Sequence, residues 1–414
     1  MKLFILFTLL SISIFSFTQN LTFYRSQIDT LCNDTMYGRG YLKDGHKVAA
    51  NYIQEEFEKF QLDVIQQDFQ ITVNTFPQVS SIIIDDTIIL TVGKDFIPSP
   101  ISGTISGDFK LLELDSIFFI SPSKERDFLN ENLSNTVLVY HQDDSDKLSN
   151  EVKKKMAYVK GIIVLKPTNL LGSFHAESLK IGMIDLLATS YPKHAHKISI
   201  NIESRIEKIT SQNVIASPLK FKKKLPTILI TAHYDHLGGY GDSCFVPGAN
   251  DNASGVAMIL DMARHFNNKP IQANLVFIAC GGEEVGLIGS SYYTEHPTIP
   301  LDKIDLVLNF DLMGAGSKGI MVQNGIEHSD VYEAFVKENN KCHYVPIVKK
   351  RGNSPNSDHY PFTQKGVKAL FIYSFGDVGG YHNILDTKEY LEYGSYESLY
   401  KLIVSTIEDL LIDL

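Results

Sequence analysis

Two adjacent glutamates, Glu283 and Glu284, follow an apolar run in the stretch LVFIACGGEEVG, residues 275–286. A run rich in branched apolar residues that ends at a glycine pair predicts a buried strand, with both acids just past its end. Ligands of open α/β sheets collect outside the carboxyl ends of the strands, so two acids there favour a metal or acid/base site. The alternative is a surface loop whose exposed glutamates open a helix and interact with its dipole. Taken alone, the motif leaves both interpretations open.

Other predicted strand ends and turns carry further side chains that can bind metal. They are His233 and Asp235 in HYDHLG, Asp251 in GANDNASG, Asp311 in NFDLMG and His382 in GGYHNILDT. Imidazoles and carboxylates together suit zinc, and this set exceeds the four ligands of a single tetrahedral ion. A dinuclear site, with ions about 3.5–4 Å apart that are bridged by one carboxylate and a hydroxide, would use all of them.

The spacing within these motifs predicts different roles. His233 and Asp235 are two apart on an extended chain and point to the same side, so the acid could orient the imidazole. Asp251 lies between two glycines, where a flexible backbone could bring its carboxylate close to both ions. Glu283 and Glu284 are neighbours and therefore diverge, so one could bind metal while the other acts as general base on the bridging water.

The elements that must position these residues follow an α/β pattern. From about residue 214 onward, strands alternate with helical segments, which predicts a mostly parallel central sheet with helices on both faces. Amphipathic helices are expected over residues 45–61 and 396–414. Residues 74–205 instead consist of short β-rich runs between turns, with one charged helix expected over residues 145–159. We therefore predict one α/β domain over residues 19–73 and 206–414, with a β-rich domain inserted over residues 74–205.

The N-terminal stretch MKLFILFTLLSISIFSFTQN combines an early lysine with an apolar run. This pattern predicts a signal peptide over residues 1–18 and export to a periplasmic or extracellular location, with an uncleaved anchor as the alternative. No later segment approaches the roughly 20 apolar residues that a membrane span requires.

The net charge of −10 argues against nucleic acid as a partner. In an oxidising compartment the four cysteines, Cys32, Cys244, Cys280 and Cys342, would permit three pairings.

Residues beside these motifs have more than one interpretation. His236 should lie on the opposite face of its strand from His233 and Asp235, which favours a structural role. Asp358 in SPNSDHYPF could cap a helix or face the site. Aromatic residues flank the motifs and could line a side-chain pocket, although aromatics more often belong to the core; they are Phe245, Phe362, Phe375 and Tyr381.

Taken together and in order, the five motifs resemble those of the secreted zinc aminopeptidase family, which includes bacterial leucyl aminopeptidases. Glutaminyl cyclases and transferrin-receptor-type ectodomains are related to that family. The resemblance runs from about Gln212 to Thr387 and implies a zinc peptidase domain with a protease-associated-like insertion. It implies that Glu283 is the general base and that Asp235 orients His233. The implied ligands of two zinc ions are His233, Asp251 as the bridge, Glu284, Asp311 and His382.

The expected function is that of an exported dinuclear zinc metallo-exopeptidase, which removes N-terminal residues from peptides with the bridging hydroxide as nucleophile. A glutaminyl cyclase with one zinc, a carboxypeptidase or dipeptidase on the same scaffold, and a catalytically inactive binding ectodomain are the alternatives. Because Glu283 would be unnecessary in a binding module, its presence favours an enzyme. The sequence leaves the preferred N-terminal side chain and the oligomeric state open.

Overall fold

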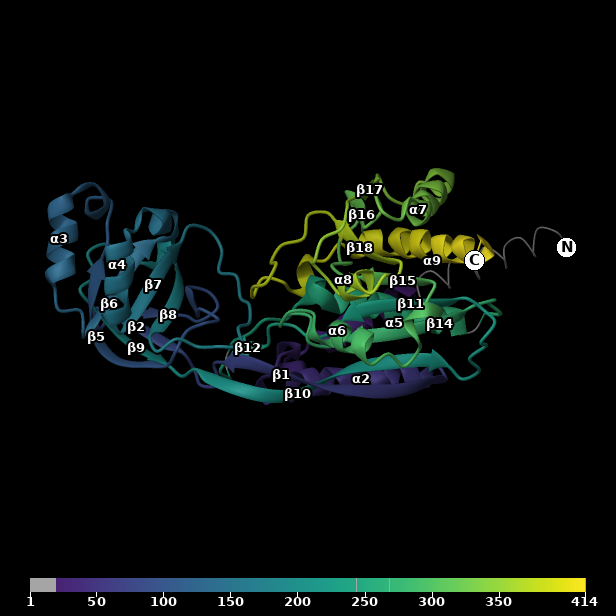
Figure 1. Ribbon diagram of the computed structural model, residues 1–414, viewed down its shortest axis with the longest axis horizontal. Helices are drawn as coiled ribbons and strands as arrows, with labels where there is room; N and C mark the ends of the chain where they lie inside the picture. The colour runs from purple at the N-terminus through teal and green to yellow at the C-terminus, as the bar shows by residue number, and fades with distance from the viewer. Residues whose placement is uncertain (1–19, 243, 268, 414) are drawn as a thin grey trace.

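The computed structural model describes residues 20–242, 244–267 and 269–413, which form two parts arranged side by side (Figure 1). The predicted signal peptide, residues 1–18, lies outside the described residues. Each part is built on an eight-stranded sheet. Within the described residues, no helix combines the length and the apolar character needed to cross a membrane.

The larger part contains the predicted α/β sheet. In spatial order its strands are β1 (Leu62–Thr75), β10 (Arg205–Pro218), β14 (Asn274–Cys280), β11 (Thr227–His233), β15 (Leu306–Phe310), β18 (Ala369–Phe375), β16 (Gly319–Gln323) and β17 (Val348–Lys350). The four central strands β14, β11, β15 and β18 run parallel and are buried, which explains their continuous apolar sequences. Antiparallel pairing of β1 with β10, β10 with β14 and β16 with β18 makes the whole sheet mixed, so the predicted parallel arrangement holds for its centre.

Helices cover both faces of this sheet, as the sequence pattern predicts. One face packs against a helix over residues 20–31 and against α2 (Gly45–Lys59), α5 (Ser254–Asn267), α7 (Ser329–Cys342) and α9 (Tyr396–Asp413). The other face packs against α6 (Ile288–Glu295) and α8 (His359–Gln364). Alternation along β11 divides the core in this way, since Ile228 and Ile230 belong to the first face and Leu229 belongs to the second.

The second part has its own sheet and its own hydrophobic core. Its strands, in spatial order, are β3 (Ile88–Leu90), β2 (Ser81–Ile84), β9 (Lys197–Ile202), β5 (Ile105–Glu113), β6 (Thr136–His141), β7 (Gly161–Lys166), β8 (Gly182–Leu187) and β4 (Phe96–Pro98). Strands β5 to β8 are parallel, and the helices α3 (Pro122–Asn130) and α4 (Asn150–Lys155) cover one face. This part is therefore itself an α/β layer rather than purely β.

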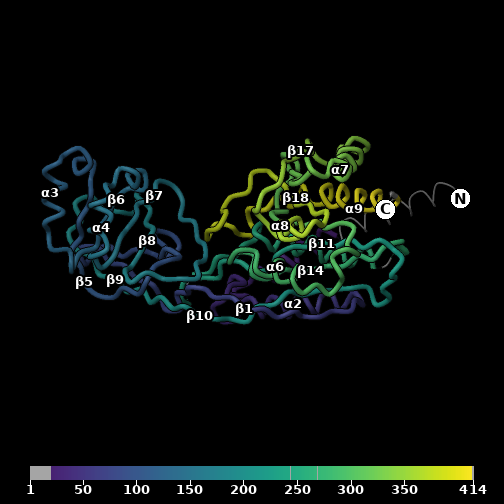
Figure 2. Tube along the Cα trace, in the orientation of Figure 1, coloured from purple at the N-terminus to yellow at the C-terminus, as the bar shows by residue number. Residues whose placement is uncertain are grey.

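The two parts are joined by β1 and β10, which pair antiparallel along their whole length and run between the two sheets (Figure 2). The core of the second sheet also includes Tyr240 and Cys244 from the hairpin of β12 (Gly239–Tyr240) and β13 (Cys244–Phe245), which follows β11. Ile384, from the segment after β18, packs against the same core. The parts therefore share packed contacts in addition to the two connecting strands.

Candidate metal centre

The parallel strands deliver the candidate ligands to one edge of the larger sheet. His233 is the last residue of β11, and Asp311 directly follows β15. The two glutamates lie three and four residues after β14, and His382 lies in the segment after β18. These residues, with others, line a cavity of about 300 Å³: His233, Asp251, Glu283, Glu284, Asp311, Leu312, Asn356, Phe371, Tyr373, Tyr381 and His382. All five expected metal ligands and the expected base therefore meet at one site.

Asp251 lies between the two histidines and faces each with a different oxygen. Its Oδ1 is 3.3 Å from His233 Nε2, and its Oδ2 is 3.1 Å from His382 Nε2. On one side, Asp311 Oδ1 is 3.2 Å from His233 Nε2. On the other side, Glu284 Oε2 is 3.2 Å from His382 Nε2. The geometry therefore contains two adjacent sets of nitrogen and oxygen donors that share one carboxylate.

The donor sets match the chemistry of zinc. Zinc binds neutral imidazole nitrogen and carboxylate oxygen, and it usually takes three or four such ligands. One donor atom each from His233, Asp251 and Asp311 lies within 4.8 Å of the others, and the same holds for His233, Glu283 and Glu284. A single bound ion would leave one histidine and its carboxylate partner unused, whereas two ions would use both sets.

The two glutamates are crowded among negative charges. Burial and the neighbouring charge of Asp251 raise the pKa of Glu284 to about 8. Burial, opposed by His233 and reinforced by Glu284, raises the pKa of Glu283 well above its usual value. A divalent cation between these carboxylates would favour their ionised forms, so the acids need the positive charge that the donor geometry could hold.

Asp235 contacts the turn with the glutamates more closely than it contacts the histidine ring. Its Oδ1 is 3.9 Å from His233 Nδ1, and the ring nitrogen instead lies 3.1 Å from the backbone carbonyl of Asp235. The carboxylate accepts the backbone N–H groups of Glu283 at 3.1 Å and Glu284 at 3.3 Å, and the hydroxyl of Tyr41 at 2.9 Å. Asp235 therefore orients His233 through its main chain and holds the glutamate turn through its side chain.

Two residues missed by the sequence interpretation hold the segment of Asp251. The fully buried guanidinium of Arg39 donates to main-chain carbonyls that include that of Asp251 at 3.2 Å; the others belong to Leu31, Tyr234, Pro247 and Gly248. The carboxylate of Asp386 accepts the backbone N–H groups of Asn250 at 2.8 Å and Asp251 at 2.9 Å. Asp386 belongs to the YHNILDT motif, which could have indicated it, whereas nothing in the sequence around Arg39 indicates its role.

Two further ligand carboxylates have buried hydrogen-bond partners. His236, expected to be structural, places Nδ1 2.7 Å from Glu284 Oε1, and burial lowers the pKa of its ring to about 3. Ser357 donates to Asp311 Oδ2 at 2.9 Å and accepts from the side-chain amide of Asn309 at 2.8 Å. His236 thus contacts a predicted metal ligand directly. Its position next to His233 and Asp235 in the sequence could have indicated this role.

The remaining sequence candidates divide between core and site. Asp358 precedes α8 but makes no capping hydrogen bond with its side chain. Its buried carboxylate oxygens have no hydrogen-bond partner in the part of the chain that the structure describes, and burial raises its pKa to about 7. Tyr381 lines the cavity together with Phe371 and Tyr373, whereas Phe362 is fully buried in the core. The aromatic wall is therefore supplied mainly by β18.

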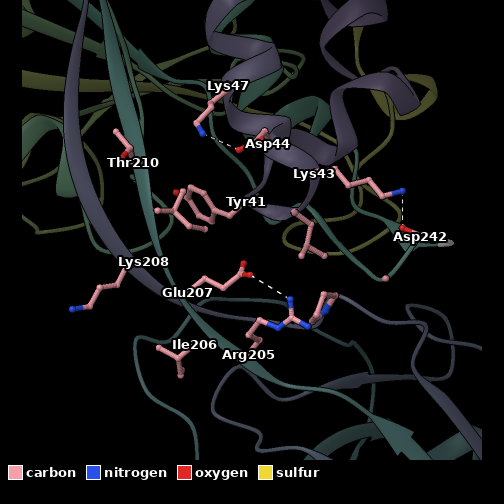
Figure 3. A pocket seen from close by; sticks show the side chains of 14 residues that line it. Tyr41, Lys43, Asp44, Lys47, Arg205, Ile206, Glu207, Lys208, Thr210 and Asp242 are labelled. Carbon is pink, nitrogen blue, oxygen red and sulfur yellow. Dashed lines mark hydrogen bonds and ion pairs between the residues drawn. The ribbon is translucent and has the colours of Figure 1, made fainter.

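A larger cavity, of about 790 Å³, lies beside β10 and the start of α2 (Figure 3). Several of its charged residues pair with one another, as in Lys43 with Asp242 at 2.6 Å and Lys47 with Asp44 at 2.9 Å. It lacks the histidines and the convergent carboxylates of the smaller cavity. We therefore assign the chemistry to the smaller cavity, although Tyr41, which lines the larger one, connects the two through Asp235.

The cysteines take no part in the centre. Cys32, Cys244, Cys280 and Cys342 are all unpaired, and Cys280 is buried at the end of β14. None of the three possible pairings is therefore formed.

Comparisons with known proteins find similar peptidases. The model of peptidase family M28 matches residues 213–407. Aminopeptidase YwaD of Bacillus subtilis is 35% identical over 172 residues, which cover 40% of this chain and 36% of that protein. A vacuolar membrane protease of Candida glabrata is 26% identical over 211 residues, which cover 50% of this chain and 21% of that protein. The matches therefore span well under two thirds of the length of these curated relatives.

Solved structures share the fold over nearly the whole chain. The structure of BSAP, a zinc aminopeptidase from Bacillus subtilis, has a TM-score of 0.71 and 22% identity and covers 94% of both chains. Porphyromonas gingivalis glutaminyl cyclase has a TM-score of 0.51 and 12% identity, with 95% of this chain and 98% of that chain covered. Residues 213–407, which the model of peptidase family M28 matches, contain every candidate metal ligand.

Proposed function

We propose that the chain is an exported aminopeptidase that binds two zinc ions and removes N-terminal residues from peptides. The observation that carries the proposal is Asp251, whose two oxygens face two different histidines at 3.3 Å and 3.1 Å. This arrangement suits a carboxylate that bridges two ions. His233 and Asp311 would hold one ion, and His382 and Glu284 would hold the other. Zinc in such a site supplies a Lewis acid for the scissile carbonyl and activates water.

Glu283 is the residue that would move protons. Its backbone N–H is bound by Asp235, and its side chain lines the cavity beside the ligands but outside the two donor sets that share Asp251. A carboxylate with a raised pKa can take a proton from water and return it to the leaving amine near neutral pH. Glu283 therefore has the position and the environment of a general base.

The cavity favours an N-terminal over a C-terminal substrate end. Its walls carry the carboxylates of Glu283, Glu284 and Asp311, and no lysine or arginine is among the described residues that line it. A carboxypeptidase needs a cation to pair with the terminal carboxylate of its substrate, most often an arginine. A free amino group instead finds acceptors here. The apolar wall from β18 would contact the side chain of the N-terminal residue.

One experiment tests the metal and the reaction together. Zinc content is measured on the purified protein, and the same sample is assayed on a panel of amino-acyl anilides and on peptides blocked at either end. Two zinc ions per chain, with hydrolysis that requires a free amino terminus, are expected. Cyclisation of N-terminal glutamine with one zinc per chain would instead identify a glutaminyl cyclase. If a zinc-loaded sample shows neither hydrolysis nor cyclisation, the remaining alternative is a catalytically inactive binding ectodomain.

The proposed export and domain limits need separate tests. N-terminal sequencing of the protein from its natural host should find residues 1–18 removed. Limited proteolysis should cut in the short connections at residues 76–80 and 203–204, which join β1 and β10 to the second sheet, before it cuts within either sheet. Intact N-termini, or cleavage that begins inside β5 to β8, would contradict these two proposals.

A further inference from the structure

The loop between β7 and β8, residues 167–181, extends from the second sheet to the metal centre. Gly172 in this loop makes two hydrogen bonds with His382. The backbone N–H of Gly172 donates to the carbonyl of His382 at 2.8 Å, and Nδ1 of the imidazole lies 3.1 Å from the carbonyl of Gly172. Figure 2 shows the segment after β18 extending toward the second sheet.

We propose that the second part of the molecule is a component of the metal centre, because Gly172 positions the ligand His382. The inference rests on the proposed zinc site. When Nδ1–H donates to a carbonyl, Nε2 keeps its lone pair and the ring orientation is fixed, which is how surrounding groups prepare a histidine for metal. Nε2 of His382 faces Asp251 and Glu284, as this role requires.

The other ligand histidine provides an internal comparison. Nδ1 of His233 lies 3.1 Å from the carbonyl of Asp235, two residues along the same strand end. His233 is therefore oriented by its own segment. His382 obtains the equivalent carbonyl from a residue 210 positions away, in a loop between two strands of the second sheet. The two halves of the centre thus depend on different parts of the molecule.

Both sides of Gly172 are anchored, so its carbonyl has a defined position. Leu170 is buried in the core of the second sheet. Phe174 packs beside Tyr41, with 5.1 Å between ring centroids, in a cluster that also contains Phe69 and Ile71 of β1. The loop is therefore anchored to the second sheet before Gly172 and to the larger part of the molecule after it.

The backbone of His382 needs such support. Its φ of 53° lies in the left-handed region, which costs free energy in a residue that is not glycine. The bond from Gly172 N–H to its carbonyl and the packing of Ile384 on the core of the second sheet both restrain this segment. These two restraints come from the second part of the molecule, whereas the bonds of Asp386 to Asn250 and Asp251 restrain the same segment from the larger part.

Gly172 can be tested because the space around it is full. A Cβ at this position would lie 2.8 Å from Leu237 Cδ1 and 3.1 Å from the hydroxyl of Tyr240. Gly172→Val should push the carbonyl away from His382, and Gly172→Ala should do so less. Gly394→Val is the matched control, because nothing lies within 4 Å of a Cβ built there. Phe174→Ala removes one anchor of the loop without adding volume. It tests the same loop if Gly172→Val fails to fold.

The measurement is zinc affinity, by titration of the metal-free full-length chain against a chromophoric chelator, with the melting temperature of the metal-free form recorded in parallel. For Gly172→Val we expect one of two zinc ions to bind about 10–100-fold more weakly, the range for loss of a group that orients a ligand. The second ion should bind as in the wild type, Gly172→Ala and Phe174→Ala should give smaller losses at the same ion, and Gly394→Val should show none.

Two results would overturn the inference while leaving the proposed function intact. One is a wild-type enzyme with two zinc ions whose affinities are unchanged in all three loop variants. The other is an equal loss at both ions that follows a lower melting temperature, which indicates general destabilisation. A wild-type chain that binds no zinc and hydrolyses no amino-acyl anilide would overturn the proposed function itself, and this inference with it.

Discussion

The hydroxyl of Tyr41 donates a hydrogen bond of 2.9 Å to Oδ2 of Asp235, although 194 residues separate them. Asp235 in turn accepts the backbone N–H groups of both glutamates. Tyr41 is buried, and its ring packs against His46 and Phe174. The N-terminal segment therefore holds the turn that presents the proposed base and one proposed ligand.

Removal of this hydroxyl should impair the reaction more than metal binding. Tyr41→Phe keeps the ring packing but leaves a buried carboxylate with one donor fewer. We expect kcat on an amino-acyl anilide to fall about tenfold, at the lower end of losses for groups that support a metal site, while both zinc ions are retained. Steady-state kinetics and metal analysis on the same sample check this. Tyr52→Phe, which removes a hydroxyl that donates to Gln27 and not to Asp235, is the control. An unchanged kcat would show that Asp235 holds the glutamate turn without the hydrogen bond from Tyr41.

Substitutions of the two adjacent glutamates should have different effects on zinc content and turnover. Glu283→Gln should keep two zinc ions while hydrolysis falls by about 10²–10⁴-fold, the usual contribution of a general base. Glu284→Gln should lose at least one zinc ion, because Glu284 Oε2 lies 3.2 Å from the ligand nitrogen of His382. Zinc content and turnover, measured for both variants, separate the roles. If Glu283→Gln loses zinc and Glu284→Gln keeps it, the two assignments must be exchanged.

Sequence reasoning reached the proposed ligands because each lies in a short local motif, either at or just past the end of a strand or in a glycine-containing turn. The central parallel strands could be predicted for the same reason. Arg39, Tyr41 and Gly172 could not, because their contacts with the centre span about 200 residues and leave no mark in the spacing of neighbouring residues. The second part was expected to be β-rich with one charged helix over residues 145–159, where α4 lies; α3 was not expected, because its nine residues contain few apolar positions.

His236 should be required for zinc at the site of Glu284. Its Nδ1 is 2.7 Å from Glu284 Oε1, and its ring is fully buried. His236→Leu removes the donor, so we expect zinc to bind about 10–100-fold more weakly at one site. His236→Asn places an amide nitrogen near the position of Nδ1 and should recover most of the affinity. Chelator competition checks both variants, and equal loss in the two would indicate a packing effect instead.

His359 should make the metal-free protein less stable in acid. Its ring is fully buried, and neither ring nitrogen has a hydrogen-bond partner among the residues that the structure describes. Burial lowers its pKa from 6.5 to about 4. Above pH 6.5 the ring is neutral in both the folded and the unfolded state, so it adds no pH dependence. Between pH 6.5 and 4 the unfolded state binds a proton that the folded state does not, so the free energy of unfolding falls as the pH falls.

At about 1.4 kcal/mol per pKa unit, this pKa difference lowers the free energy of unfolding of the wild type by about 3 kcal/mol at pH 4. His359→Gln cannot titrate, so its free energy of unfolding should fall by about 3 kcal/mol less than that of the wild type between pH 7 and pH 4. Urea denaturation of the metal-free proteins at both pH values measures the difference without interference from zinc release. His196→Gln, at an exposed position in the second sheet's part, should follow the wild type. Parallel pH dependence of wild type and His359→Gln would mean that His359 is protonated in the folded protein, contrary to its buried position.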